Sequence, residues 1–457
     1  MTTLDPASPS RLSRRTRPTA LAFALVGAVM MVAIPAVQAQ TFSVIHNFTN
    51  GPDGGTPSTG MTIDRAGNLY GTTASGGGGG CQDGCGIVFK LAQRGSGWVL
   101  TPLYGFQGDH DGARPCSRIT IGSDGTLYGT TSQGGGTQCP AGPGCYPNGN
   151  GGCGTVFNLA PPAHASGSVL GTWNETVLYR FTGESDGAYP QGDIAFDANG
   201  NLDGVTTEGG TFGQDCGTQL GDGCGTLYQL TRSGSGWTEN VLHSFQPTND
   251  GAGPYGGVVL DAAGSIYVTT FGDSFGERPG VSCGGTVIQF TQSGGNWQST
   301  LLHLFGQQLD GCEPFGGMIF DPSGNLYGAT PAIEEGGPVG SGEVYELSYS
   351  PSNGWQYSIL FEFPNDGYEG PVSTLLMDSA GNLYGTTRSY GLHRYGEVFE
   401  LARNGGGWTY IDLHDFTGGA DGGYPYGSLV QDSAGNVYGT AETGGAYNHG
   451  VIFALTP

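Results

Sequence analysis

The chain has 457 residues, 89 of them glycine, and its 15 basic and 39 acidic side chains give a formal net charge of −24. A protein this acidic is repelled by phosphate groups, which argues against nucleic acid and anionic membrane surfaces as partners. Lys90 is the only lysine, so lysine-dependent chemistry would have to rest on that one side chain.

Residues 1–39 are expected to be a secretory signal peptide. Four arginines precede an apolar run at 19–34, and residues 37–39 suit a cleavage site. An uncleaved membrane anchor is the alternative, but the run is shorter than the ~20 apolar residues that a spanning helix needs. The mature domain is predicted to span 40–457, secreted or periplasmic, without membrane insertion.

One octet recurs seven times along the mature chain, which indicates a repeat fold. The copies are AGNLYGTT at 66–73, DGTLYGTT at 124–131, NGNLDGVTT at 199–207, AGSIYVTT at 263–270, SGNLYGAT at 323–330, AGNLYGTT at 380–387 and AGNVYGT at 434–440. We expect Asn and Gly to form a turn and Leu and Tyr to fill the faces between repeats. The glycine after Tyr is expected to leave room for that ring.

Each repeat contains four strand-like segments, a to d. Segment a follows a proline and ends in Asp, segment b is the octet's NLYGTT, segment c reads GTVFxL, and segment d begins at a Trp. The chain has seven c segments but only six tryptophans, and the missing d segment is found at 42–48. A closed ring removes exposed sheet edges. We therefore predict an all-β, seven-bladed β-propeller, with four antiparallel strands per blade, in which the N-terminal strand completes the C-terminal blade.

The combination GNLYGTT, GTVFxL, GxW, LYxF and DGxxP resembles the GloVer-type (choice-of-anchor) tandem repeat of secreted bacterial proteins. The resemblance covers the whole mature chain. It implies secretion and a propeller-like repeat, and it implies no defined activity.

Loop variation is concentrated on one predicted face. The b–c loops there range from 8 residues (388–395 and 442–449) to 22 (132–153), and all ten cysteines fall in these loops or in the d–a connections. An even number of cysteines in an exported chain indicates disulfides, and we expect the pairs Cys81–Cys85, Cys216–Cys224 and Cys283–Cys312. A zinc site at CQDGC is the alternative, although those loops lack histidine.

The d–a connections share an Asp-Gly pair, which would form a circlet of seven carboxylates. An Asp bonding backbone N–H groups in a tight turn is the favoured interpretation, and calcium binding is the alternative. No other cofactor is expected. The aspartates are Asp53, Asp111, Asp186, Asp250, Asp310, Asp366 and Asp421.

Histidines and tyrosines in the short loops are the candidate ligand-binding residues. His46, His243, His303 and His414 share a d-segment position with Tyr104, Tyr179 and Phe361 and are interpreted as packing residues. The candidate catalytic side chains are His393, His449 and His110. The ligand-binding candidates are Tyr390, His393, Arg394, Tyr395, Tyr447 and His449, from adjacent blades.

Asp203 replaces the octet's tyrosine in the third repeat. A carboxylate between blades is costly without partners, so either the strand bulges there or the group is functional. The bulge is the favoured interpretation.

No Ser-His-Asp arrangement, HExxH motif, phosphate loop or dinucleotide fingerprint is present. The favoured function is a secreted, monomeric, non-enzymatic propeller that recognises an extracellular glycan or protein through the variable face. The alternative is an extracellular lyase or hydrolase, with or without a divalent metal, that uses His and carboxylates at the channel mouth. A binder needs aromatic platforms, an enzyme needs a convergent His/carboxylate pocket, and a purely structural protein needs neither.

Overall fold

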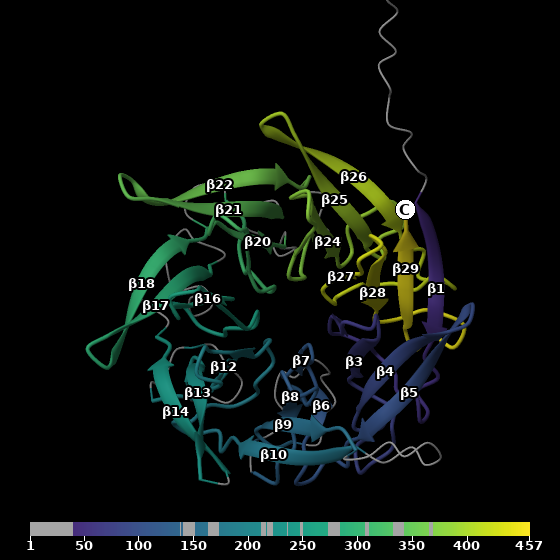
Figure 1. The fold of residues 1–457 in the computed structure, drawn as a ribbon, viewed down its shortest axis with the longest axis horizontal. Coiled ribbons are helices and arrows are strands. Elements are labelled where there is room, and N and C mark those ends of the chain that lie inside the picture. Colours follow the sequence, from purple (N-terminus) through teal and green to yellow (C-terminus); the bar gives the residue numbers. More distant parts are fainter. Residues whose placement is uncertain are drawn as a thin grey trace, which may run out of the picture. The chain divides into compact units, whose positions relative to one another are not determined.

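A computed structural model describes residues 40–137, 139, 151–162, 173–211, 216, 223–234, 236–246, 250–272, 284–306, 310–331, 342–364 and 369–457. These residues belong to one compact unit. They form seven antiparallel sheets arranged in a ring as a seven-bladed β-propeller, so the predicted fold is confirmed (Figure 1). The described residues contain no helix, and so none that could span a membrane.

Every blade repeats the same order of inner, second, third and outer strand, which correspond to segments a to d. The inner strands are β2 (Thr62–Ile63), β7 (Thr120–Ile121), β11 (Ala195–Phe196), β15 (Val258–Leu260), β19 (Ile319–Phe320), β23 (Leu376–Met377) and β27 (Val430–Gln431). The second strands are β3 (Leu69–Thr73), β8 (Leu127–Gln133), β12 (Leu202–Thr206), β16 (Ile266–Thr270), β20 (Leu326–Thr330), β24 (Leu383–Thr387) and β28 (Val437–Ala441).

The third and outer strands form the rim of the ring, and in every blade except the second they are longer than the two strands inside them. The third strands are β4 (Ile87–Arg94), β9 (Thr155–Ala160), β13 (Thr226–Ser233), β17 (Thr286–Ser293), β21 (Glu343–Ser350), β25 (Glu397–Asn404) and β29 (Val451–Thr456). The outer strands are β5 (Gly97–Gly105), β10 (Asn174–Arg180), β14 (Gly236–Ser244), β18 (Asn296–Leu304), β22 (Gly354–Glu362), β26 (Gly407–Asp415) and β1 (Thr41–Asn47). In blade 2, β6 (Ala113–Pro115) also pairs with β8.

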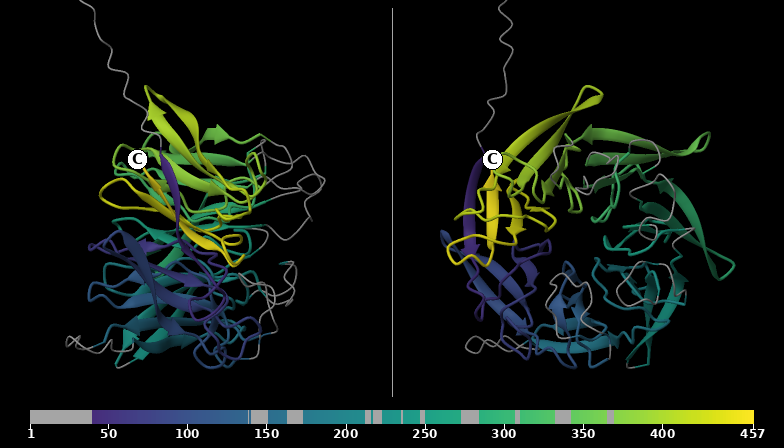
Figure 2. Two further views of the ribbon diagram at one scale, coloured as in Figure 1. Left: turned by 90° about the vertical axis from the view of Figure 1, so that its right-hand side faces the viewer. Right: turned by 180° about the vertical axis from the view of Figure 1, so that it is seen from behind.

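The ring closes where β1 pairs with β29. The register runs from Thr41 opposite Thr456 to Asn47 opposite Val451. Two views from opposite sides show the N-terminal strand, in purple, beside the C-terminal strand, in yellow (Figures 1 and 2). The side chain of Asn47 also accepts a hydrogen bond from the backbone N–H of Ala446 at 2.7 Å. The two ends of the domain are therefore joined within one blade, as the sequence predicted.

The octet tyrosine is held by the aspartate that ends the inner strand. In blade 1, one oxygen of Asp64 accepts the backbone N–H groups of Ala66 and Asn68, each at 2.9 Å. Its other oxygen accepts the hydroxyl of Tyr70 at 3.1 Å. A single carboxylate thus satisfies the tight turn and fixes the tyrosine that packs on the next blade.

The octet glycine has a different role from the one predicted. A Cβ on Gly71 would lie 2.6 Å from the ring of Phe89 on the third strand, and a Cβ on Gly439 would lie 2.4 Å from that of Phe453. Blade 4 replaces this glycine with Val268 and the aromatic residue with Ile288, whose backbones pair in register. The glycine therefore makes room for the third-strand ring and not for the octet tyrosine.

Within the described residues, the hydrophobic core forms seven clusters, each lying between neighbouring blades. In the cluster that joins blade 7 to blade 1, Phe48, Phe89 and Tyr438 are buried, and Trp98 packs against them. The ring centroids of Trp98 and Tyr438 are 5.5 Å apart at 71°, an edge-to-face contact. No blade buries its faces without its neighbours, so stability depends on the ring as a whole.

The prediction of a bulge at Asp203 is wrong. β12 pairs with β13 in continuous register, with Asp203 opposite Gln229 and Gly204 opposite Tyr228. Val205 takes the place of the octet's first threonine, so the strand has no inserted residue. Asp203 is fully buried, and the Gln229 side chain donates to its Oδ1 at 2.8 Å. Burial, partly opposed by that hydrogen bond, raises the pKa of its carboxyl to about 7.

Candidate functional site

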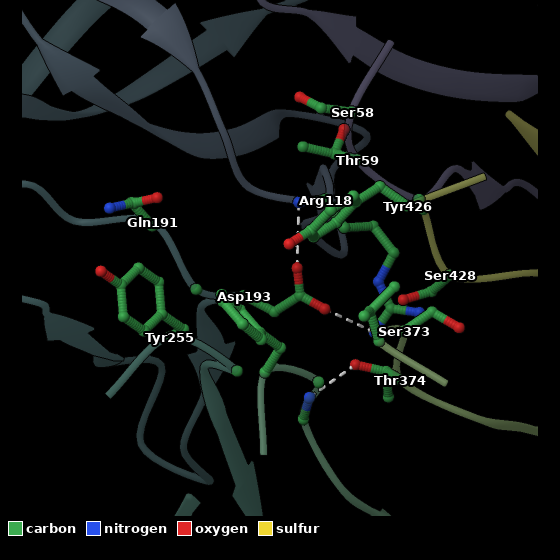
Figure 3. Close-up of a pocket in the computed structure, with 18 of the residues that line it drawn as sticks. Ser58, Thr59, Arg118, Gln191, Asp193, Tyr255, Ser373, Thr374, Tyr426 and Ser428 are labelled. Carbon is green, nitrogen blue, oxygen red and sulfur yellow. Dashed lines mark hydrogen bonds and ion pairs between the residues drawn. The ribbon is translucent and has the colours of Figure 1, made fainter. Parts of the chain in front are cut away.

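A pocket of about 390 Å³ lies on the ring axis and is lined by residues from all seven blades (Figure 3). Most of them occupy the same place in the repeat, the first to third residue after the proline that precedes each inner strand. They are Ser58, Thr59, Gly60, Cys116, Arg118, Gln191, Gly192, Asp193, Tyr255, Gly256, Phe315, Gly316, Gly317, Val372, Ser373, Thr374, Tyr426, Gly427 and Ser428. Arg388 and Glu442, which directly follow second strands, complete the lining.

An unusual backbone turn leads into the pocket. The residue before the proline has a positive φ of 54–58° in five blades, at Thr56, Arg114, Tyr189, Glu313 and Tyr424. Such values are uncommon outside glycine. Each backbone N–H donates to a carbonyl in the b–c loop of the preceding blade; that of Thr56, for example, donates to His449 at 2.9 Å. This bond between blades offsets the cost of the turn.

Four aromatic side chains form a connected cluster at the pocket. Tyr255, Phe271 and Phe315 contact one another with ring centroids 4.6–5.5 Å apart. Phe315 also meets Tyr426 edge-to-face at 6.2 Å. Tyr255, Phe315 and Tyr426 line the pocket and are partly exposed, so these three rings give it an aromatic wall, which Phe271 contacts from outside the lining.

Two arginines face the pocket, and both are engaged. Arg118 forms an ion pair with Asp193 at 3.1 Å, and its backbone N–H donates to the same carboxylate at 2.9 Å (Figure 3). Arg388 pairs with Glu369 at 2.5 Å and lies over the ring of Tyr426, 5.3 Å from its centroid. Neither guanidinium group is left as an unbalanced positive charge.

Further carboxylates surround this site. Burial, reinforced by the charge of Glu369, raises the pKa of Glu313 to about 7, and burial alone raises that of Glu208 to about 7. Burial also raises the pKa of Glu442, and the nearby charge of Arg388 opposes that rise. The pKa of Tyr255 rises to about 12, mainly through burial and secondarily through the charge of Glu208.

The loop residues proposed from the sequence do not line this pocket. Tyr390 packs in the core on Phe363, with ring centroids 5.3 Å apart, and Tyr395 packs on Tyr424 at 5.4 Å. His393, Arg394 and Tyr447 are exposed, and His449 is partly exposed. His110 is exposed beside Asp109, 3.6 Å away.

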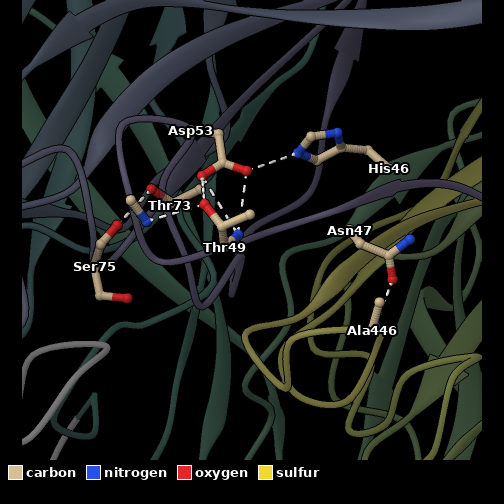
Figure 4. Close-up of polar contacts among 8 residues, drawn as sticks. His46, Asn47, Thr49, Asp53, Thr73, Ser75 and Ala446 are labelled. Atoms are coloured by element: carbon tan, nitrogen blue, oxygen red, sulfur yellow. Dashed lines mark hydrogen bonds and ion pairs between the residues drawn. The ribbon is translucent and has the colours of Figure 1, made fainter.

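Six of the seven Asp-Gly aspartates lie in described residues, and Asp366 lies outside them. Each of the six bonds or ion-pairs with the outer-strand His or Tyr seven residues earlier, as Asp53 does with His46 at 3.2 Å (Figure 4). Asp111 accepts the hydroxyl of Tyr104 at 2.8 Å, and Asp310 bonds His303 at 2.8 Å. His243 pairs with Asp250 and His414 with Asp421 in the same way. Backbone N–H groups donate to several of these aspartates, as Thr49 does to Asp53. The outer-strand histidines therefore pack in the blade, as expected, and also hold the Asp-Gly turns in place.

Among the described residues, Glu397, Asp412 and Asp415 form the acidic group close enough to share a cation, with one oxygen of each within 4.8 Å of the others. The aspartates of the circlet do not belong to it. Each of the six described aspartates instead bonds or ion-pairs with side chains or backbone groups of its own connection and outer strand.

We expect Asp186→Ala to lower the free energy of unfolding by about 2–3 kcal/mol, because three hydrogen-bond donors lose their charged acceptor. Asp186 is buried and accepts from the Thr182 backbone N–H at 2.8 Å, the Thr182 hydroxyl at 2.6 Å and the Tyr179 hydroxyl at 3.0 Å. Urea unfolding measures the change, and Glu184→Ala, an exposed site in the same connection, is the control. EDTA is expected to leave the wild-type midpoint unchanged. A calcium-induced rise that Asp186→Ala removes would instead support the cation hypothesis.

Disulfides join Cys81 to Cys85, Cys216 to Cys224 and Cys139 to Cys153. The first two pairs are those expected from the sequence, and the third is new. Cys116 and Cys312 are also disulfide-bonded, while Cys283, the expected partner of Cys312, lies outside the described residues. The described cysteines include no free thiol, which disfavours zinc and indicates an oxidising compartment.

The profile of the Gloeobacter/Verrucomicrobia repeat matches residues 27–218, 145–367 and 277–457. The chain belongs to this repeat family. No match is found among curated proteins.

Solved structures share the fold at low identity. An ulvan lyase, a polysaccharide lyase, aligns with a TM-score of 0.52 at 11% identity over 91% of this chain and 95% of that one. The same kind of enzyme bound to a -[GlcA(1-4)Rha3S]- saccharide gives 0.51 at 11% identity, with the same coverage. A putative 6-phosphogluconolactonase from Bacteroides uniformis gives 0.44 at 16% identity over 78% of this chain and 84% of that one.

Sequence reasoning missed the pocket. Its signal is that the residues after each proline differ from blade to blade, as in Ser-Thr-Gly, Gln-Gly-Asp and Phe-Gly-Gly, while the flanking repeat is nearly constant. Variation at one position of a repeat, without a change in length, marks a surface that the scaffold does not need for packing.

Proposed function

We propose that this protein is a secreted binding propeller that holds part of an extracellular glycan in the pocket on the ring axis. The aromatic wall formed by Tyr255, Phe315 and Tyr426 is the observation that carries the proposal. A sugar presents an apolar C–H face that packs on such rings, and its hydroxyls suit the Ser, Thr and Gln side chains around them.

The size and position of the pocket favour a glycan over a protein surface. A volume of about 390 Å³ fits one or two sugar units. The lining residues directly follow the connections from outer to inner strands, which supports recognition from the face that bears those connections and the b–c loops. An ulvan lyase of the same fold is described with a bound saccharide, which supports the proposal by analogy of fold alone.

Export is part of the proposal. The three disulfides among described residues need an oxidising compartment. The arginines and apolar run of residues 1–39 supply the pattern of a cleaved signal peptide.

Phe315→Ala is expected to weaken glycan binding by about 5–150-fold, because losing one aromatic anchor of a binding site costs about 1–3 kcal/mol. Isothermal titration with tetramers of glucose, N-acetylglucosamine, glucosamine and galacturonic acid measures the change. Tyr349→Ala is the control, because this ring is 58% exposed on β21 and does not line the pocket. Equal affinities of Phe315→Ala and wild type would contradict the proposed site.

A lyase or hydrolase that acts on a substrate in the same pocket is the alternative function. Glu442 favours it, because this carboxyl lines the pocket and burial raises its pKa, the direction that suits a general acid. Among the described lining residues, however, no histidine accompanies Glu442 and Asp193. Chromatography of the same tetramers after long incubation separates the two functions, since a binding protein leaves them uncleaved.

A further inference from the structure

We propose that the ion pair of Arg118 and Asp193 recognises two neighbouring hydroxyl groups of a neutral sugar in the pocket. This inference rests on the proposed function and names its ligand class, a glycan whose units keep a free vicinal diol, such as an oligomer of 1,4-linked glucose. It is carried by the way the pair is fixed beside the aromatic wall and by its unused hydrogen-bonding capacity.

The pair is anchored to three neighbouring blades. Oδ1 of Asp193 accepts the backbone N–H of Arg118 at 2.9 Å, and Oδ2 lies 3.1 Å from Nη2 of the same arginine (Figure 3). The carbonyl of Asp193 accepts the N–H of Val258 in blade 4 at 3.2 Å. The hydroxyl of Thr120 in blade 2 donates to the carbonyl of Ile194 in blade 3 at 2.7 Å. These bonds hold the carboxylate and the guanidinium in a set orientation before a ligand enters.

A glycine brings the pair against the aromatic wall. A Cβ on Gly192 would lie 2.2 Å from the backbone nitrogen of Gly257 and 2.9 Å from the carbonyl oxygen of Tyr255. The connections of blades 3 and 4 therefore touch backbone to backbone, which only glycine allows at this position. Because Asp193 directly follows Gly192, its carboxylate is fixed next to the segment that carries the Tyr255 ring.

Both partners keep hydrogen-bonding capacity toward the pocket that they line. The side chain of Arg118 is 37% exposed and that of Asp193 is 22% exposed, so a ligand can reach them. Among the described residues, each oxygen of Asp193 meets one N–H group, and the guanidinium bonds through Nη2 alone. An ionised carboxylate offers about four acceptor positions and a guanidinium five N–H donors. The pair therefore presents acceptors and donors side by side.

A vicinal diol matches this arrangement. One hydroxyl can donate to the carboxylate while its neighbour accepts from the guanidinium, and both bonds are charge-assisted. A pyranose stacked on an aromatic ring directs its equatorial hydroxyls outward, toward groups at the edge of the stacking surface. Tyr255 and Phe315 supply that surface from blades 4 and 5, and the ion pair lies beside it on blades 2 and 3.

The same pair disfavours two other classes of sugar. An N-acetyl group at C2 of a 1,4-linked unit removes one hydroxyl of the diol and adds bulk in a pocket of about 390 Å³. Polar groups of the site then lose a partner, which opposes binding. A uronate keeps the diol but adds a carboxylate, which is repelled by Asp193 and by the formal net charge of −24.

Isothermal titration of the full mature chain at pH 7 tests the inference with 1,4-linked tetramers of glucose, N-acetylglucosamine and galacturonic acid. We expect the glucose tetramer to bind at least about tenfold more tightly than either of the others, because it alone is neutral and keeps the diol. Its affinity should also be insensitive to salt, because the ligand carries no charge.

Two conservative variants test the role of the ion pair. Asp193→Asn keeps an acceptor for the backbone N–H of Arg118, and Arg118→Lys keeps the positive charge, but each removes one half of the planar charged pair. Each should weaken the glucose tetramer severalfold and leave the acetylated tetramer nearly unchanged, a split that a general loss of structure would not produce. Asp83→Asn, exposed and outside the pocket, is the matched control, and circular dichroism checks that each variant folds.

The outcomes separate the inference from the proposed function. Equal or tighter binding of the acetylated or the galacturonic tetramer, still lost in Phe315→Ala, would overturn recognition of a neutral diol and keep the glycan site. A preference for glucose that survives in both Asp193→Asn and Arg118→Lys would overturn the role of the ion pair. Binding of none of the three tetramers would overturn the inference, and the proposed function would fall with it if the glucosamine tetramer also failed to bind.

Discussion

A chain that begins at Thr49, and so lacks β1 and Phe48, is expected to lose the cooperative unfolding transition of the ring. The deletion leaves β29 as an unpaired edge and opens the cluster between blades 7 and 1, in which Phe48 is fully buried. Removing one buried phenylalanine typically costs about 3–5 kcal/mol, and the register of β1 with β29 is lost in addition. Thermal unfolding and light scattering measure the loss of stability and the aggregation expected of the exposed edge.

Strand complementation provides the control for this deletion. A synthetic peptide of residues 40–50, added to the truncated chain, is expected to pair with β29 and restore the transition, whereas a peptide of the same composition in scrambled order is not. Unchanged thermal stability of the truncated chain would show that β1 does not hold the ring closed.

Asp203→Tyr is expected to stabilise the protein by about 2–4 kcal/mol at pH 7 and above. Blade 4 provides the template: Tyr267 occupies the equivalent position, donates to Asp261 at 3.0 Å and accepts from Gln289 at 2.7 Å. Blade 3 retains the matching Asp197 and Gln229, so a tyrosine at 203 finds both partners in place. The substitution removes a buried carboxyl and adds buried aromatic surface.

The gain should depend on pH. Because the folded pKa of Asp203 is raised from 3.8 to about 7, the folded state binds the proton more tightly than the unfolded state. The wild-type protein therefore loses stability from this group as the pH rises from about 4 to 7. The advantage of Asp203→Tyr should be smallest near pH 4 and reach its full value above pH 7, as measured by urea unfolding.

Two further variants serve as controls for this prediction. Asp203→Asn should remove the pH dependence without the packing gain, and Tyr267→Asp should destabilise blade 4 by a comparable amount. A loss of stability in Asp203→Tyr would show that the blade 3 interface has closed around the smaller side chain.

The sequence by itself determined the number of blades, the order of their strands and the closure by residues 42–48. These follow from a repeated local pattern, because turn residues and alternating apolar residues act over a few positions and each repeat needs a neighbour to bury its faces. It also predicted two disulfides within single loops, Cys81–Cys85 and Cys216–Cys224, whose cysteines are close in the chain.

Only the tertiary structure decided where the candidate site lies. Phe315, Tyr426 and Arg118 come from blades 5, 7 and 2, and they meet because the ring turns the same position of every repeat toward one axis. The pairing of outer-strand histidines with Asp-Gly aspartates, and the regular strand at Asp203, likewise depend on how the chain folds back on itself. Local patterns specify each blade, but the chemistry of the pocket depends on differences among seven blades that only closure of the ring brings within contact distance.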